Sequence, residues 1–151
     1  MRNEMEPKRV LVVDDDRDFV QTLERYLRVA GYEVSCAYGG MGALEEIRVC
    51  NPSAVILDVM MPDIDGRRIV RYIREKMGDK KTAVIVLSAL TDHSSRTNLM
   101  MDGANDYLTK PCDPARISKS VEQFTSQAAS QGAAQGAAQV GKKDSILDSY
   151  M

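Results

Sequence analysis

The sequence has no stretch approaching the roughly 20 consecutive apolar residues that a membrane-spanning helix needs. Residues 1–9 are rich in charge and lack the apolar core of a signal peptide. Basic residues do not cluster, and 20 Lys and Arg against 22 Asp and Glu give a net charge of -2. The charge pattern therefore favours neither nucleic acid nor an anionic membrane as a partner. Together these absences predict a cytoplasmic protein.

Cysteine and histidine are also scarce. Cys36, Cys50 and Cys112 are odd in number and lack the spacing of a metal site, so we expect reduced thiols. His93 is the only histidine and lies in a polar segment, where a position on the solvated surface is expected. The 44% hydrophobic and 28% charged residues are typical of one globular domain.

The sequence does contain four short apolar runs, each followed or closed by a reactive polar residue. The runs are Val10–Val13, Val55–Leu57, Ala83–Leu87 and Tyr107–Thr109, and the residues that follow them are Asp14, Asp58, Ser88 and Lys110. Short β-branched runs of this kind are typical of strands buried on both faces of a parallel sheet. Ligands of such sheets bind beyond the carboxyl ends of the strands. We therefore expect the four polar side chains to meet at one edge.

Helical patterns alternate with the strands, and residues 32–38 supply a fifth strand. One expected helix opens at Gly66 and ends at Gly78, with Ile73 and Met77 on its apolar face. Strands and helices that alternate through short loops form right-handed crossovers. The sequence therefore predicts an α/β fold, a single doubly wound (βα)5 domain with a five-stranded parallel sheet.

Composition sets the expected boundaries of this domain. Residues 1–7 form an N-terminal extension, residues 8–127 the domain, and residues 128–151 a low-complexity tail rich in Ala, Gln and Gly. The alanines could prolong the last helix, but each glycine costs about 1 kcal/mol against alanine, so a frayed helix grading into a linker is expected. The final apolar residues, 146–151, are either part of a disordered tail or a short docking motif.

The expected edge of the sheet has the chemistry of a phosphoryl-transfer site. Asp14, Asp15 and Asp58 would repel one another unless a cation lay among them, and Mg²⁺ suits such a carboxylate set, with Mn²⁺ as a substitute. Asp58 would then stay ionised and could attack phosphorus. Lys110 could pair first with Asp58 and then with a phosphoryl oxygen, and the Ser88 hydroxyl could bond the same group.

Neighbouring acidic residues have simpler expected roles. Asp16 is expected to cap the helix that follows it. Asp63 and Asp65 lie in a Pro-Asp-Ile-Asp-Gly segment and are expected to form a turn.

Over residues 8–126 the chain resembles the receiver domain of two-component response regulators, of the single-domain, chemotaxis-regulator type. The motifs are Leu-Val-Val-Asp-Asp at 11–15, Leu57-Asp58-x-x-Met61-Pro62-Asp63-x-Asp65-Gly66, Ser88-Ala89 and Lys110-Pro111. The resemblance implies a flavodoxin-like fold in which Asp58 is the phosphorylation site. It also implies metal binding by Asp14, Asp15, Asp58 and the backbone carbonyl of Met60.

The same resemblance implies roles for the remaining site residues. Ser88 and Lys110 would bind the phosphoryl group, and Tyr107 would be the aromatic switch residue that turns inward. The Lys110–Pro111 peptide bond matches one that is commonly cis. The phosphoryl group would come from a histidine kinase or a histidine phosphotransfer protein. A downstream protein would bind the face made by the fourth helix, fifth strand and fifth helix, and the chain would catalyse only its own phosphorylation and dephosphorylation.

The chain departs from the family pattern at a few positions. Cys112 stands where phenylalanine is frequent, so packing under the last helix is expected to be looser. Met60 and Leu90 occupy positions that tune dephosphorylation, and bulky apolar side chains there should hinder the attacking water. We therefore expect slow self-dephosphorylation.

Three alternatives stay open or are disfavoured. The chain is either a stand-alone receiver or the receiver part of a longer regulator, such as a DNA-binding one. It could also be an interaction module that works without phosphorylation, although all site residues are present. A phosphatase of the haloacid dehalogenase type is disfavoured, because that chemistry needs a second aspartate where this chain has Met60.

Overall fold

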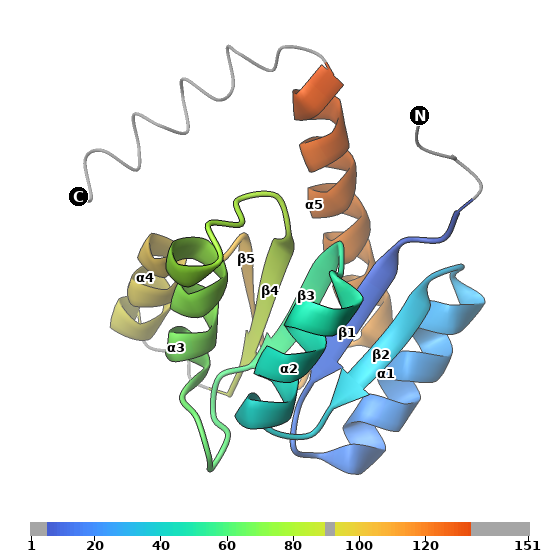
Figure 1. The fold of residues 1–151 in the computed structure, drawn as a ribbon. Helices are drawn as coiled ribbons and strands as arrows, with labels where there is room; N and C mark the ends of the chain where they lie inside the picture. Colours follow the sequence, from blue (N-terminus) through green and yellow to red (C-terminus); the bar gives the residue numbers. More distant parts are fainter. Residues whose placement is uncertain (1–5, 90–92, 134–151) are drawn as a thin grey trace.

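Five parallel strands form one sheet at the centre of the molecule (Figure 1). The computed structural model describes residues 6–89 and 93–133. The strands are β1 (Arg9–Val13), β2 (Glu33–Ala37), β3 (Ala54–Asp58), β4 (Ala83–Ser88) and β5 (Asp106–Thr109). Their order across the sheet is β2-β1-β3-β4-β5, with every neighbouring pair parallel. The predicted fold class is confirmed.

Helices cover both faces of this sheet (Figure 1). They are α1 (Arg17–Val29), α2 (Gly40–Cys50), α3 (Gly66–Arg71) with its π-helical continuation η1 (Tyr72–Lys76), α4 (His93–Asp102) and α5 (Pro114–Ala133). Buried side chains of α1 and α5 join one hydrophobic cluster, and those of α2, α3 and α4 join another. Alternate residues of β1 and β3 enter the two clusters, because successive strand side chains point to opposite faces.

The strand order reverses at β1, which pairs with β2 on one side and with β3 on the other. Such a switch point leaves a crevice beyond the carboxyl ends of the two diverging strands. Val13 of β1 aligns with Leu57 of β3. The residues that follow, Asp14 and Asp58, therefore emerge side by side at this crevice.

The segment after β3 differs from the single regular helix predicted over 66–78. A π-turn begins at Tyr72, whose carbonyl accepts a hydrogen bond from the Met77 amide five residues later. Met77 is 37% exposed and does not continue the predicted apolar face. Beside the wide turn, the Arg74 guanidinium donates to the Gly103 carbonyl at 3.0 Å. This tertiary contact accompanies the change of helical period.

Helix α5 extends into the stretch where the sequence predicts a frayed helix grading into a linker. It continues to Ala133, so residues 128–133 of the predicted linker are helical. The helix-forming alanines outweigh the single glycine in this stretch. The apolar residues at 146–151 lie outside the described part of the chain.

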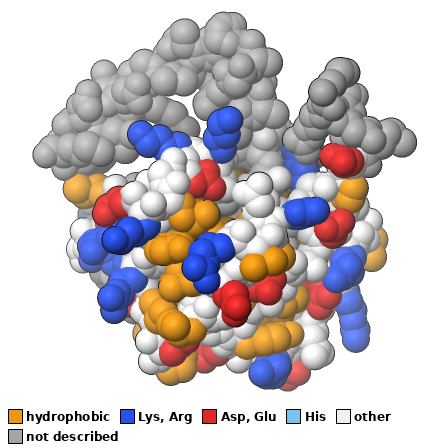
Figure 2. Space-filling view, viewed as in Figure 1, with side chains coloured by type: hydrophobic (Ala, Val, Ile, Leu, Met, Phe, Trp, Pro, Cys, Tyr) orange, Lys and Arg blue, Asp and Glu red, His pale blue; other side chains and the backbone are white. Residues whose placement is uncertain are grey.

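The surface of the described residues shows no segregation of charge on the face in Figure 2, where acidic and basic side chains intermingle with apolar ones. Among the exposed apolar side chains are Met41 and Val49 of α2, at 65% and 73%. Within the described ranges, no helix is both long enough and apolar enough to cross a bilayer.

Candidate functional site

Three carboxylates gather at the crevice beyond β1 and β3. Asp14 and Asp15 follow β1, and Asp58 is the last residue of β3. One carboxylate oxygen from each of the three lies within 4.8 Å of the other two. Asp14 and Asp58 are only 1% and 6% exposed, whereas Asp15 is open to solvent. The site thus offers a compact set of oxygen ligands that solvent reaches from one side.

The Lys110 ammonium lies against these carboxylates. Its Nζ atom is 2.6 Å from Asp14 Oδ2 and 3.8 Å from Asp58 Oδ2. The ion pair with Asp58 expected from sequence is thus the longer of two, and the hydrogen bond goes to Asp14. Asp14 is the more deeply buried carboxylate, so it has less water around it and gains more from a cation. The Lys110–Pro111 peptide bond is cis.

The buried position of Asp58 changes its acidity. Burial, together with the nearby Asp14 charge, raises the pKa of Asp58 from 3.8 to about 6. The Lys110 ammonium acts in the opposite direction, as does the Met60 amide, which donates to Asp58 Oδ1 at 3.3 Å. A further cation in the cluster would favour the ionised carboxylate, which is the nucleophilic form.

Short loops hold the acidic residues in place. Asp14 Oδ1 accepts the Asp16 amide at 3.0 Å. Asp16 caps α1, as predicted, by accepting the Phe19 amide at 3.2 Å. After β3 the chain folds back so closely that a Cβ atom on Gly66 would lie 2.7 Å from the Cα atom of Val59. Only glycine fits there, and the tight return keeps the loop after Asp58 over the site.

Comparison with known proteins identifies the family. The sequence profile of the response regulator receiver domain matches residues 10–122. The chain belongs to this family.

Curated relatives agree with this assignment. The transcriptional regulatory protein PrrA of Mycobacterium leprae is 45% identical over 103 residues, which are 68% of this chain and 43% of that protein. The response regulator MprA of Mycobacterium sp. strain KMS is 44% identical over 105 residues, covering 70% of this chain and 45% of MprA. The chain therefore spans less than half the length of these relatives.

Solved structures have the same architecture. The receiver domain of the Francisella response regulator 1452 superposes with a TM-score of 0.75 at 31% identity, covering 80% of this chain and 98% of that domain. The chemotaxis response regulator CheY4 of Vibrio cholerae gives a TM-score of 0.73 at 29% identity, covering 79% of this chain and 99% of that one.

In this receiver domain the donor set suits a hard divalent cation. Carboxylate oxygens from Asp14, Asp15 and Asp58 are the ligand type that Mg²⁺ prefers, and Mg²⁺ usually retains several waters beside one or two carboxylates. The exposed Asp15 leaves the solvent side open for such waters. Met60, which follows in the loop after β3, is 55% exposed.

The other residues singled out from sequence lie along the next two strands. Ser88 ends β4, is fully buried and aligns with Thr109 of β5. Tyr107, two residues earlier on β5, is 5% exposed and therefore turned inward in this structure. The Arg96 guanidinium of α4 lies 5.8 Å from the centre of the Tyr107 ring. The ring is thus in contact range of α4.

Sequence analysis missed a structural role of Asp63. Besides forming its own turn, Asp63 accepts the amides of Gly40 and Met41 at 3.0 and 3.2 Å. It thereby caps α2, which has no cap from the side chain of its own preceding residue. Asp65 caps α3 by accepting the Arg67 amide at 3.0 Å. The link from Asp63 to α2 crosses more than 20 residues, so no local pattern could show it.

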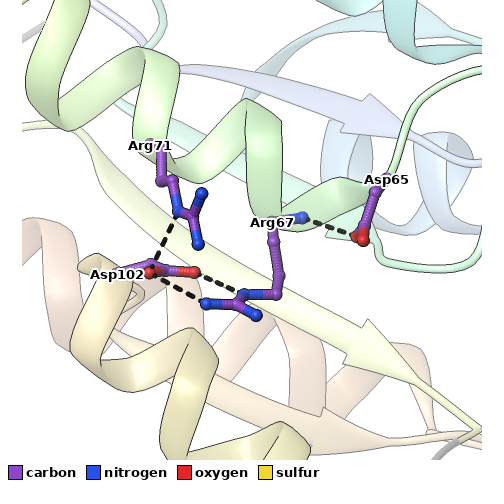
Figure 3. Close-up of polar contacts among 4 residues, drawn as sticks. All are labelled: Asp65, Arg67, Arg71 and Asp102. Atoms are coloured by element: carbon purple, nitrogen blue, oxygen red, sulfur yellow. Dashed lines mark hydrogen bonds and ion pairs between the residues drawn. The ribbon is translucent and has the colours of Figure 1, made fainter.

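A second polar cluster joins α3 to α4 (Figure 3). Asp102, at the end of α4, accepts Arg67 Nε at 2.7 Å and Arg71 Nε at 3.3 Å. Sequence analysis gave these residues no role. Leu99 is the only fully buried residue among those described in α4, and Met100 packs partly buried on the same core, so the ion pairs add a polar attachment to this apolar one.

Proposed function

We propose that this receiver domain is a phosphorylation-controlled switch in which Asp58 accepts the phosphoryl group. The observation that carries the proposal is the placement of the Asp58 carboxylate, 6% exposed and at the end of β3, beside two further carboxylates and 3.8 Å from the Lys110 ammonium. A buried nucleophile with cationic and metal-binding partners is what phosphoryl transfer to a carboxylate requires.

The proposed step is an in-line displacement at phosphorus. One Asp58 carboxylate oxygen forms the new bond to phosphorus, and the bond from phosphorus to the histidine nitrogen of a kinase or phosphotransfer protein breaks. The leaving nitrogen keeps the electron pair. Asp14, Asp15, Asp58 and the Met60 carbonyl would hold Mg²⁺, which when bound neutralises charge on the transferring group. Lys110 would supply a second positive charge to the same oxygens.

The proposed output is a change in the conformation of one face of the domain. A phosphoryl group adds about -1.5 to -2 charges at neutral pH. Ser88 and Lys110 would be drawn towards it, and the inward position that Tyr107 has on the neighbouring strand would be stabilised. This would shift an existing equilibrium on the face made by α4, β5 and α5, where a downstream protein would bind. We place this signalling in the cytoplasm, with residues 8–127 as the functional domain.

We propose the partners by their class of protein. A histidine kinase or histidine phosphotransfer protein is proposed as donor because the chain belongs to the receiver family. The names of two relatives describe regulators, one of them of transcription. A receiver within a longer regulator is the alternative to a stand-alone receiver, because the matched residues make up only 43% and 45% of those two relatives.

Intact-mass analysis after incubation with acetyl phosphate and Mg²⁺ tests the phosphoacceptor. We expect one phosphoryl adduct on the wild type, none on Asp58→Asn, and none on either when EDTA removes the metal. A folded wild type that takes up no phosphoryl group would contradict the proposal and favour an interaction module. The same samples, followed after the donor is removed, test slow dephosphorylation, which a half-life of seconds would contradict.

A further inference from the structure

The Lys110 ammonium contacts an aromatic ring as well as carboxylates. Its Nζ atom lies 4.8 Å from the centre of the Phe19 ring, within the range of a cation–π interaction. The same atom donates to Asp14 Oδ2 at 2.6 Å. The cation is therefore held by the ring and the carboxylate together, and neither the sequence motifs nor the proposed mechanism uses the ring.

The position of the Phe19 ring does not depend on Lys110. Phe19 lies in the first turn of α1, where its amide donates to the Asp16 cap at 3.2 Å. Its side chain is half-buried and packs against the hydrophobic cluster that α1 and α5 share. Helix cap and core thus fix the ring, and the flexible lysine side chain adapts to it.

Both oxygens of Asp14 are engaged in this arrangement. Oδ1 accepts the Asp16 amide at 3.0 Å, and Oδ2 accepts Lys110. Each oxygen keeps a second lone pair, so a divalent cation can bind Asp14, but it then lies close to the donors already there and is repelled by the Lys110 ammonium. The amide belongs to the turn that starts α1, whereas the ammonium sits on four flexible methylenes, so Lys110 is the donor that gives way.

We propose that Phe19 is a positioning residue that holds Lys110 on Asp14 and thereby sets the affinity of the acidic cluster for Mg²⁺. The proposal rests on the proposed function, in which this cluster binds Mg²⁺. The Phe19 ring stabilises the Lys110 ammonium in its position on Asp14, which is the position that a bound metal ion makes unfavourable. The Lys110 Nζ atom lies only 3.8 Å from Asp58 Oδ2. A short movement of the released side chain would therefore bring it to a phosphoryl group on Asp58.

Removing the ring should therefore tighten metal binding. Phe19→Leu and Phe19→Met keep an apolar side chain against the core but lose the π face, whereas Phe19→Tyr keeps it. From the strength of cation–π contacts at partly exposed sites, we expect Mg²⁺ to bind the Leu and Met variants about twofold to fivefold more tightly. The Tyr variant should match the wild type. Isothermal titration with MgCl₂ measures the Kd, and circular dichroism checks that each variant is folded.

The Phe19 substitution, repeated in a protein that carries Lys110→Met, shows whether Phe19 acts through Lys110. In Lys110→Met the cation is absent, so Phe19→Leu should no longer change the Mg²⁺ Kd, and the double-mutant cycle should show coupling. An unchanged Kd in both ring-deleted variants, or equal tightening with and without Lys110, would overturn the proposal.

The results that would contradict the proposed function differ from those that would contradict the role of Phe19. A wild type that binds no Mg²⁺ and forms no adduct would overturn both ideas. A wild type that binds Mg²⁺ and forms an adduct, but whose cycle shows no coupling, would overturn only the role of Phe19.

Discussion

At the scale of single residues, the buried Asp58 carboxylate destabilises the fold when it is ionised. Burial raises its pKa to about 6 in the fold, whereas an unfolded chain has a value near 3.9. The protonated form therefore stabilises the fold, fully below the unfolded pKa, and this contribution is lost as the pH rises through about 6. We expect Asp58→Asn, which carries no charge at any pH, to increase the free energy of unfolding at neutral pH by roughly 1–3 kcal/mol.

Urea unfolding without Mg²⁺, repeated between about pH 4 and 8, measures this difference. The gap between variant and wild type should be small at the acid end and widen through the titration of Asp58. Asp15→Asn is the matched control, since it removes the same charge from an exposed side chain of the same cluster. Parallel curves for wild type and Asp58→Asn would show that Asp58 titrates normally.

Among the elements, α4 has one fully buried residue among those described and two ion pairs that connect it to α3. Its C-terminus carries a partial negative charge, so Asp102 would be unfavourable there without a cation. Arg67 and Arg71 of α3 supply two, at 2.7 and 3.3 Å, and both are partly exposed. Because solvent screens such pairs, we expect Arg67→Gln to cost only about 1 kcal/mol of global stability.

The larger effect of Arg67→Gln should be local. Loss of its ion pair with Asp102 should loosen the end of α4, so backbone amides near residues 99–102 should exchange with deuterium faster than in the wild type, while the amides of the sheet keep their exchange rates. Arg68→Gln is the matched control, because Arg68 is an exposed arginine of the same helix. Equal exchange in the two variants would contradict a role for the ion pair in attaching α4.

The elements also show what the sequence could reveal. Strands β1, β3 and β4 were predictable because each is a continuous apolar run that ends at a polar residue. The clustering of Asp14 with Asp58 followed from the same pattern, since parallel strands bring their carboxyl ends to one edge. The assignment of Asp16 as a helix cap depended only on local spacing, and it is confirmed.

Long-range contacts were not predictable in the same way. The π-turn at Tyr72 accompanies an Arg74 contact with Gly103, which lies in a different segment. Asp63 caps a helix whose first residue, Gly40, lies 23 positions earlier in the chain. Lys110 bonds most closely to Asp14, a preference that depends on the relative burial of two carboxylates in the folded chain. Each of these features is set by tertiary structure, which local periodicity does not encode.

For the whole molecule, the acidic cluster couples metal binding to folding. Three carboxylates brought within 4.8 Å by β1 and β3 exist as a site only in the folded state. A ligand that binds only this state stabilises it by mass action, by about 2.7 kcal/mol at 100 times the Kd. We therefore expect Mg²⁺ to raise the Tm of the wild type by several degrees, saturating as the site fills.

Thermal melts over a series of MgCl₂ concentrations, at constant ionic strength, measure this shift. Asp14→Asn should abolish most of it, because the variant loses a buried ligand oxygen and the charge that attracts the cation. Glu45→Gln removes one charge from an exposed position on α2 and should respond like the wild type. If Asp14→Asn gained as much stability as the wild type, Mg²⁺ would be acting by general screening of the acidic surface. The cluster beyond β1 and β3 would then not be the site of binding.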